Sequence, residues 1–249
     1  MNKVDILGVQ VDKVDMEQAL NRILEFLKED KAHAVYTPNS EIIMQAYRNQ
    51  AFRDVLNTAD LITPDGIGVV YASRIVKDPL AERVGGFDLA TKLIEKAADG
   101  SISFYFFGGK PGVAEQAKEN LQKKYPGLRI IGCSDGYFDA EKEQKIIADI
   151  NEKQPDVLFV CLGAPKQEIW IDQNRDKLAV KVCMGLGGSL DVFAGNVKRA
   201  PTVFQKLGLE WLYRLCKEPK RIGRMMDLPR FGMTVLLHGR KFPQEGQKT

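Results

Sequence analysis

Short β-rich runs alternate with helical patterns through the first 194 residues, and this alternation constrains the fold more than any other feature of the sequence. Several runs are apolar at successive positions, which is typical of strands buried on both faces of a parallel sheet. The expected strands are Val4–Leu7, His33–Thr37, Leu61–Thr63, Ile102–Phe107, Leu128–Gly132, Val157–Leu162 and Val180–Met184. Strands joined by helices make right-handed crossovers. The sequence therefore predicts an α/β fold, a Rossmann-like, doubly wound and mainly parallel sheet.

Residues at the expected helix starts support this alternation of strands and helices. Asp15 followed by Gln18 forms a capping box ahead of apolar residues at helical spacing. Other helices are expected to begin at Asn39, Asp139, Pro111 and Pro165. Ligands of doubly wound sheets bind at the carboxyl ends of the strands, so functional residues are expected in the loops that follow the strands.

The composition excludes several classes of protein. With 44% hydrophobic residues and a net charge of only +3, the chain is not expected to be disordered. The longest apolar run, Val157 to Ala164, is far shorter than the roughly 20 residues of a membrane-spanning helix. The N-terminal residues lack the apolar region of a signal peptide. The four cysteines form no C-x-x-C pair, so we expect reduced thiols in a cytoplasmic protein.

The C-terminal part of the chain is basic. Residues Gly195 to Thr249 include twelve Lys or Arg and four Asp or Glu, which gives this part a net charge of +8. The first 194 residues carry a net charge of −5. A basic tail on a weakly acidic body indicates an anionic partner, and a solvated basic helix is the alternative. Apolar residues recur at helical spacing from Phe204 to Leu215, among basic ones. We therefore expect an α/β core, residues 1–195, and a helical, basic, amphipathic C-terminal appendage, residues 196–249.

Two of the loops after strands carry polar groups suited to catalysis. In Thr37–Asn39 a hydroxyl and an amide are expected to point into the crevice, although Asn39 can equally serve as a helix cap. In Thr63–Gly66 the carboxylate of Asp65 follows a buried strand, where a general base is presented. Pro-Asp-Gly is also an ordinary turn sequence, so this motif alone leaves both interpretations open.

Three further loops combine glycines with polar residues next to expected helix starts. Glycines there let a phosphate approach backbone N–H groups, although neither a Walker A loop nor G-x-G-x-x-G is present. A lysine and a glutamine can reach a phosphate or a sugar hydroxyl, or lie on the surface, and an aspartate can accept hydrogen bonds from a ribose or a base. The residues are Gly108 and Gly109, Lys166 and Gln167, and Gly187 and Asp191.

The residues of several other chemistries are missing. Only His33 and His238 are present and no cysteines cluster, so a zinc site is not expected. The sequence has no D-x-D clamp for a metal diphosphate and no G-x-S-x-G elbow. A nucleotide-dependent oxidoreductase would need G-x-G-x-x-G. A non-catalytic membrane or nucleic-acid binder would explain the basic tail, but would leave the loops of Thr37, Asp65 and Gln167 without a role.

Taken together, the loops resemble those of a known family. The chain contains, in this order, TPNSE, TPDGIGVVYASR, ERVGGFDL, FYFFGGKPGVAE, DGYF, LFVCLGAPKQEIWI, GLGGSLDVFAGNVKRAP and LEWLYRLCKEPKRIGR. With these motifs it resembles the WecG/TagA/CpsF family of bacterial glycosyltransferases from about residue 3 to about residue 240. Within that family it is most similar to the members that serve wall teichoic acid synthesis.

The resemblance implies an inverting transfer of N-acetylmannosamine from UDP-N-acetylmannosamine to the 4-hydroxyl of GlcNAc on undecaprenyl diphosphate, giving a β-1,4 disaccharide. The uronic acid of the same sugar is the alternative donor. The implied partners are the UDP-sugar, the polyprenyl-diphosphate-linked acceptor and the cytoplasmic leaflet of the cell membrane, with no nucleic acid, no cofactor and no metal. Apolar faces of the tail would also allow a homo-oligomer. The tail would act as a lid at the membrane and stabilise the departing diphosphate through Arg214, Arg221 and Arg224.

The resemblance also implies roles for residues of the core. Asp65 is the expected general base, with Thr37 and Gln167 beside it in catalysis. Arg83 is expected to contact phosphate, and Tyr137 to stack on uracil. The full set of expected substrate-binding residues in the core is Asn39, Arg83, Gly108, Gly109, Tyr137, Lys166, Gly187 and Asp191.

Overall fold

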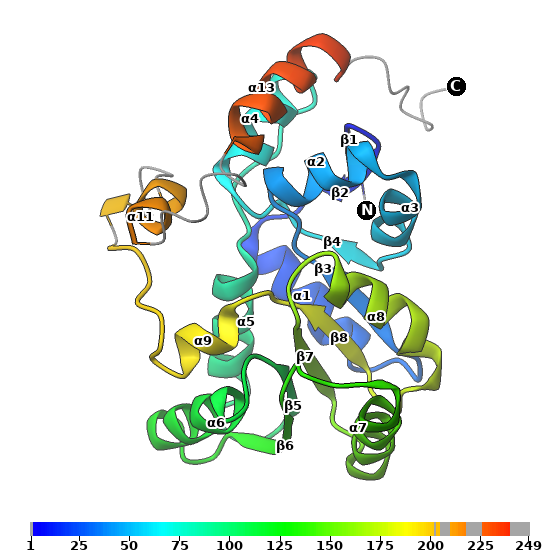
Figure 1. Ribbon diagram of the computed structural model, residues 1–249, viewed down its shortest axis with the longest axis vertical. Coiled ribbons are helices and arrows are strands. Elements are labelled where there is room, and N and C mark those ends of the chain that lie inside the picture. The colour runs from blue at the N-terminus through cyan, green and yellow to red at the C-terminus, as the bar shows by residue number, and fades with distance from the viewer. Residues whose placement is uncertain (1, 202, 205–209, 218–225, 240–249) are drawn as a thin grey trace.

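A six-stranded sheet whose strands all run parallel forms the centre of the protein (Figure 1). The structure is a computed structural model and describes residues 2–201, 203–204, 210–217 and 226–239. The strands are β3 (His33–Tyr36), β4 (Leu61–Ile62), β5 (Ser103–Gly108), β6 (Arg129–Ser134), β7 (Val157–Cys161) and β8 (Val182–Gly185). Their spatial order is β4-β3-β8-β7-β5-β6. Six of the seven predicted strands are thereby confirmed, each to within two residues at either end.

The seventh predicted strand lies outside this sheet. β1 (Lys3–Ile6) pairs antiparallel with β2 (Val9–Asp12), a strand that the sequence analysis missed, in a separate two-stranded sheet. Leu7 and Gly8, which join the two strands, both have positive φ, at 57° and 89°. Two such residues make the tight turn of a hairpin, whereas a parallel partner needs a crossover of a dozen or more residues. The short connection therefore fixes the antiparallel pairing.

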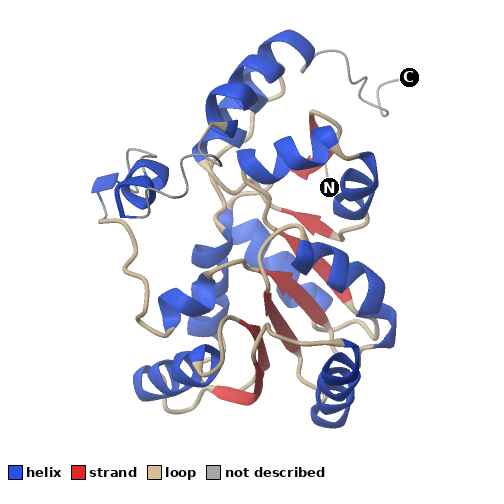
Figure 2. Cartoon of the chain, in the orientation of Figure 1, coloured by secondary structure: helices blue, strands red, loops and turns tan. Residues whose placement is uncertain are grey.

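Helices cover both faces of the main sheet (Figure 2). One face is covered by α1 (Met16–Phe26), α5 (Gly86–Lys96), α6 (Val113–Lys124) and α9 (Ser189–Phe193). The other face is covered by the hairpin and by α2 (Ser40–Arg48), α3 (Gln50–Asn57), α4 (Ile67–Ile75), α7 (Ala140–Lys153) and α8 (Lys166–Asn174), after which comes a 3-10 turn (Arg175–Lys177). Within β5, Phe104 and Phe106 pack into the first core, and Tyr105 and Phe107 into the second. This burial on both faces explains why the strands are apolar at successive positions.

Several predicted helix starts are confirmed by the caps. Asp15, Asn39 and Asp139 each accept a hydrogen bond from a backbone N–H in the first turn of α1, α2 and α7. The predicted start at Pro111 is wrong by two residues. Gly112, in the left-handed region with φ 85°, forms the N-cap of α6, so the proline belongs to the preceding turn.

The strand order opens a crevice at the carboxyl edge of the sheet. β3 and β8 are neighbours, yet α2 follows β3 on one face and α9 follows β8 on the other. In doubly wound sheets, ligands bind where the connections of neighbouring strands diverge in this way. The loops that follow β3, β4 and β8 are therefore the expected position of a site.

The last described helix, α13 (Asp227–His238), lies on the core. Phe231 and Val235 are buried in the same hydrophobic cluster as residues of α2 and α4, and these helices lie next to α13 in Figure 1. Arg48 of α2 donates to both carboxylate oxygens of Asp227, at 2.5 and 3.3 Å. α13 is therefore held by apolar packing along its length and by an ion pair at its start.

A second helix of the C-terminal part, α11 (Glu210–Lys217), carries the apolar pattern predicted around Trp211. The described residues leave out the side chain of Arg214 and the whole of Leu207, Arg221 and Arg224. The contacts expected of the three arginines therefore stay predictions. The expected division at residue 195 likewise stays a prediction. Within the part of the chain that the structure describes, no helix is both long and apolar enough to cross a membrane.

Candidate active site

The loop after β3 is held against the end of β8. The Thr37 hydroxyl donates to the Gly185 carbonyl at 3.2 Å, and the Thr37 side chain is buried. Asn39 accepts from the backbone N–H of Ile42 at 3.0 Å, so it caps α2 as well as facing the crevice. Both side chains that the sequence analysis selected in this loop therefore have fixed positions at the sheet edge.

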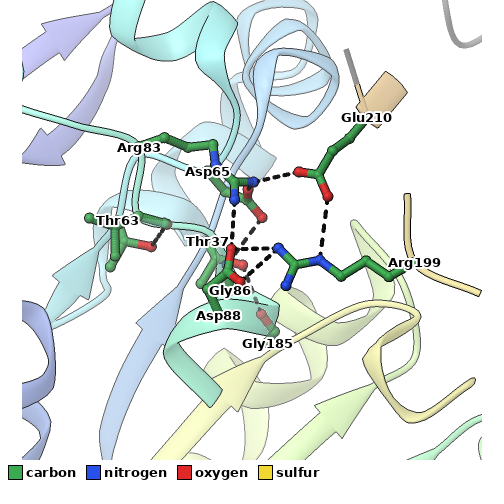
Figure 3. Close-up of polar contacts among 10 residues, drawn as sticks. Thr37, Thr63, Asp65, Arg83, Gly86, Asp88, Gly185, Arg199 and Glu210 are labelled. Atoms are coloured by element: carbon green, nitrogen blue, oxygen red, sulfur yellow. Dashed lines mark hydrogen bonds and ion pairs between the residues drawn. The ribbon is translucent and has the colours of Figure 1, made fainter. Parts of the chain in front are cut away.

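Asp65 follows β4 and faces the start of α5 (Figure 3). Its carboxylate accepts from the Gly86 backbone N–H at 3.3 Å and lies 3.8 Å from Nη1 of Arg83. A Cβ at Gly86 would lie 2.5 Å from Oγ1 of Thr37, so a glycine is needed where α5 approaches the β3 loop. The Asp65 side chain is 30% exposed. This carboxylate is therefore both positioned and accessible.

Two arginines and two acidic residues form a closed ring of ion pairs beside Asp65 (Figure 3). Arg83 donates to Asp88 at 2.6 Å and to Glu210 at 2.8 Å. Arg199 reaches both oxygens of Asp88, at 2.7 and 2.8 Å, and its Nε lies 3.5 Å from Glu210. None of the four side chains is more than 25% exposed, so solvent screens these pairs only in part. The ring links the start of α5 to the start of α11.

A cavity of about 440 Å³ lies between this ring and α13. Charged residues of the lining are Glu41, Asp65, Arg83, Asp88, Arg199 and Glu210. Apolar and aromatic residues of the lining include Ile67, Tyr71, Ile75, Trp211, Phe231 and Val235. Among the described residues, no three His, Cys, Asp or Glu side chains are grouped so that they could hold a metal ion. The cavity therefore offers a ligand both charged groups and an apolar surface.

Glycine turns at the ends of β5 and β8 form the neighbouring part of the same sheet edge. Gly108 has φ 133°, and a Cβ there would lie 2.3 Å from the Cys161 carbonyl oxygen, which leaves no room for another residue. The backbone N–H groups of Gly109 and Gly187 donate within the protein, to the Cys161 carbonyl and to the Gln167 side chain. Neither N–H is therefore a free donor; open space adjoins Gly187, whereas Val113 packs against Gly109.

Lys166 and Tyr137 lie beside these turns. The backbone N–H of Gly136 donates to the Gly109 carbonyl at 2.9 Å, which sets the 135–138 loop against the β5 turn. Lys166 donates to the Gly136 carbonyl at 3.3 Å, and the Tyr137 ring is 62% exposed. Asp191 lies in the first turn of α9, after β8. A cation and an exposed aromatic ring thus adjoin the first glycine turn.

Gln167 lies beneath the β8 turn rather than on the surface. It is 3% exposed, its Oε1 accepts from the Gly187 N–H at 2.8 Å, and its Nε2 donates to Glu168 at 2.8 Å. Glu168 is buried as well, and burial raises the pKa of its carboxyl. Its Oε2 has no hydrogen-bond partner among the residues described. The Gln167–Glu168 pair therefore holds the turn by which β8 enters the site.

The predicted site residues thus form two adjoining groups. One group surrounds the cavity, the other follows the glycine turns, and the hydrogen bond from Thr37 to Gly185 joins the two. Sequence reasoning missed four residues of this edge: Asp88, Glu168, Arg199 and Glu210. All four lie within the motifs that carry the family resemblance, and this was the signal that could have found them.

Known proteins align with most of the length of this chain. The sequence model of the glycosyl transferase WecG/TagA/CpsF family matches residues 4–245. A protein of Bacillus spizizenii is 42% identical over 216 residues, 86% of this chain and 83% of its own length. A protein of Staphylococcus aureus strain MRSA252, which like the first is named N-acetylglucosaminyldiphosphoundecaprenol N-acetyl-beta-D-mannosaminyltransferase, is 39% identical over 241 residues, 96% of this chain and 94% of its own. This chain therefore belongs to the WecG/TagA/CpsF family of glycosyl transferases.

Proposed function

We propose that this chain transfers N-acetylmannosamine from UDP-N-acetylmannosamine to the 4-hydroxyl of GlcNAc-diphosphoundecaprenol, with inversion, to form the β-1,4 disaccharide of the wall teichoic acid linkage unit. The observation that carries the proposal is the identity of 39–42%, over 86–96% of the chain, to two proteins named as mannosaminyltransferases of that lipid-linked GlcNAc. The cavity supports such an acceptor, because two arginines that can bind a diphosphate and apolar side chains that can contact an isoprenoid chain line the same space.

Asp65 is our candidate for the base that activates the acceptor hydroxyl. Inversion in one displacement requires removal of the hydroxyl proton as the new sugar–oxygen bond forms. The Asp65 carboxylate is held by the Gly86 N–H and lies on the cavity wall. Arg83 is 3.8 Å away and can bind a substrate phosphate, which would position the hydroxyl relative to the base.

We assign the UDP part of the donor to the glycine turns. Gly108 and Gly109 form the turn at the end of β5, and Lys166 supplies a cation next to it. The exposed ring of Tyr137 is available to stack on uracil. Asp191, at the start of α9, supplies a hydrogen-bond acceptor for the nucleoside.

Thr37 and Gln167 set the position of the β8 end between the two substrates. Thr37 holds the Gly185 carbonyl and Gln167 holds the Gly187 N–H, so both act on the same turn from opposite sides of the crevice. We propose that this turn fixes the distance between the donor sugar and Asp65. Their contribution to catalysis is then one of positioning.

The protein is further proposed to act as a peripheral protein on the inner face of the cell membrane. Apolar side chains of the C-terminal part are exposed, and a basic region next to an apolar surface favours anionic lipid surfaces. Among the described residues of this part, the large exposed apolar ones are Val197, Val203, Trp211, Met226, Met233, Leu236 and Leu237. Arg214, Arg221 and Arg224 remain our candidates for stabilising the departing UDP.

A transfer assay with a GlcNAc-diphosphate-lipid acceptor and a panel of UDP-sugars tests this function. We expect a disaccharide product from UDP-N-acetylmannosamine, and we expect it to persist in excess EDTA, because arginines would stabilise the leaving diphosphate. Transfer from the uronic acid donor alone would assign the chain to another surface polysaccharide. Binding of UDP without transfer from any donor would leave a non-catalytic nucleotide-binding protein.

A further inference from the structure

The ring of ion pairs beside Asp65 contains two carboxylates, and only one of them comes from the residues 1–195 of the expected core. Asp88 lies in the first turn of α5, five positions after Arg83, and stays in the core with it. Glu210 begins α11 and lies 127 positions from Arg83 along the chain. Glu210 is therefore the carboxylate of the ring that can leave without disturbing the helices around the sheet.

The contacts of Glu210 are those that a bound anion would make. Its Oε2 accepts from Arg83 at 2.8 Å, and its Oε1 lies 3.5 Å from Nε of Arg199, so one oxygen faces each guanidinium. Guanidinium groups that converge on one anion bind phosphate in the same manner as carboxylate. Figure 3 shows a dashed line from each arginine to the Glu210 carboxylate, while the terminal nitrogen of Arg199 is directed at Asp88.

The charges of the ring decide whether an anion can enter. With Glu210 in place, two arginines face two carboxylates, and the carboxylate of Asp65 lies close to the same group. A diphosphate entering this neutral ring would meet Glu210 as a like charge. Without Glu210, Arg83 and Arg199 face Asp88 and the nearby Asp65, so the group has one negative charge fewer and the donors that Glu210 occupied are available. Glu210 and a diphosphate therefore compete for the same place.

We infer that Arg83 and Arg199 form a diphosphate-binding site that Glu210 occupies until a substrate diphosphate displaces it. The ring residues line the same cavity as the apolar and aromatic side chains of Tyr71, Ile75 and Phe231, which favours a polyprenyl diphosphate. UDP carries the same chemical group. The choice of a diphosphate as the anion rests on the proposed function, whereas the competition rests on the ring alone.

Displacement has a mechanical consequence. Glu210 links α11 to the core directly through Arg83, and indirectly through Arg199, which binds Asp88 of α5. When a diphosphate takes these two arginines, that link breaks and the start of α11 is released.

Calorimetric titration of the full-length protein with UDP and, separately, with farnesyl diphosphate tests the inference. We expect Glu210→Gln, which keeps the shape and removes the charge, to bind at least one of the two about three- to tenfold more tightly than the unaltered protein. Glu141→Gln is the matched control, because Glu141 pairs with Lys145 on exposed α7 and its loss changes the net charge equally. It should leave both affinities unchanged. Arg199→Lys, without the planar fork, should bind more weakly.

The two ligands identify the source of the diphosphate. Tighter binding of farnesyl diphosphate alone assigns the site to the acceptor, and tighter binding of UDP alone assigns it to the donor. Unchanged or weaker binding of both ligands by Glu210→Gln, in a variant with an unaltered melting temperature, overturns the inference. Absence of sugar transfer by a protein that still shows the Glu210 effect would remove the proposed function and leave the anion site standing.

Discussion

The carboxylate of Asp65 is held from two directions before any substrate is present, by the Gly86 N–H and by the nearby Arg83. The residue belongs to a turn between Pro64 and Gly66, and a polar side chain in such a turn contributes little apolar burial. Replacing the carboxylate by an amide of the same shape should therefore affect the chemistry far more than the stability of the fold.

We expect Asp65→Asn to lower turnover by about 10²–10⁴-fold, because the acceptor hydroxyl loses its base, while the melting temperature and UDP affinity stay close to those of the unaltered protein. Asp99→Asn serves as the control, since Asp99 also lies in a turn, where it accepts from Ser101, but beyond the far end of α5. Initial rates and thermal melts measure the difference. Turnover equal to that of the control would remove Asp65 from the mechanism.

The buried carboxyl of Glu168 is expected to make the free energy of unfolding depend on pH. Burial raises the pKa of its carboxyl, so the folded protein holds this proton more tightly than the unfolded chain. The contribution of Glu168 to stability therefore falls as pH rises from the ordinary carboxyl pKa through the raised value, by about 1.4 kcal/mol for each tenfold change in the acid constant. Glu168→Gln keeps an oxygen that can accept from Gln167 and removes the titration.

Thermal melts of both proteins between about pH 4 and pH 8 check this sign. The melting temperature of Glu168→Gln, relative to that of the unaltered protein, should rise with pH. A difference that stays constant over the whole range would show that Glu168 does not titrate there.

Sequence reasoning located Thr37 and Asp65 at strand ends, because a polar residue directly after an apolar strand must lie at the edge of the sheet. It missed Glu168 and Glu210, because a helical pattern does not reveal which acidic residue is buried or which one reaches a distant arginine. The partner of Glu210 lies 127 positions away. Such pairings are set by tertiary structure, so the pattern of apolar and polar residues along a helix does not reveal them.

At the scale of the element, most strands and helix starts were predicted from apolar runs and capping residues. Strands such as β5 and β7 were found because burial on both faces leaves a continuous apolar segment. β2 was missed because the turn before it uses Leu7 at positive φ, a conformation that sequence signals associate with glycine or asparagine. The start of α6 was misplaced because proline is common at both turns and first helical positions.

The docking of α13 provides a test at the same scale. Phe231→Ala removes a ring that is buried against the core, and we expect a loss of about 3–5 kcal/mol in the docking of this helix. Met233→Ala, two positions away and 62% exposed, should have almost no effect. In Phe231→Ala, hydrogen exchange should accelerate in α13 and not in the sheet. Equal protection of α13 in both variants would show that the Arg48–Asp227 pair suffices to hold it.

For the whole molecule, the separation of an acidic body from a basic tail sets how it meets a surface. The first 194 residues carry −5 and the rest +8, and exposed leucines of α13 lie in the basic part. An anionic membrane should therefore attract one end of the molecule and repel the other.

Co-sedimentation with anionic liposomes checks this orientation. Joint replacement Leu236→Ser and Leu237→Ser should weaken binding at least about tenfold, because two exposed leucines no longer enter the lipid. Val197→Ser removes an exposed apolar residue outside α13 and should leave binding unchanged. Unaltered binding of the double variant would show that basic residues alone hold the protein on the membrane.

The residues that line the cavity extend along the chain from Asn39 to Val235, and this has a consequence for protein synthesis. A ribosome adds about 5–20 residues per second, so Asp65 and the cavity residues of α13 are translated on the order of ten seconds or more apart. During that interval the sheet can fold, while the wall formed by α13 does not yet exist. A nascent chain that stalls before residue 231 therefore carries Asp65 on a folded sheet without an enclosed pocket, so translation order itself delays assembly of the site until nearly the whole chain has been made.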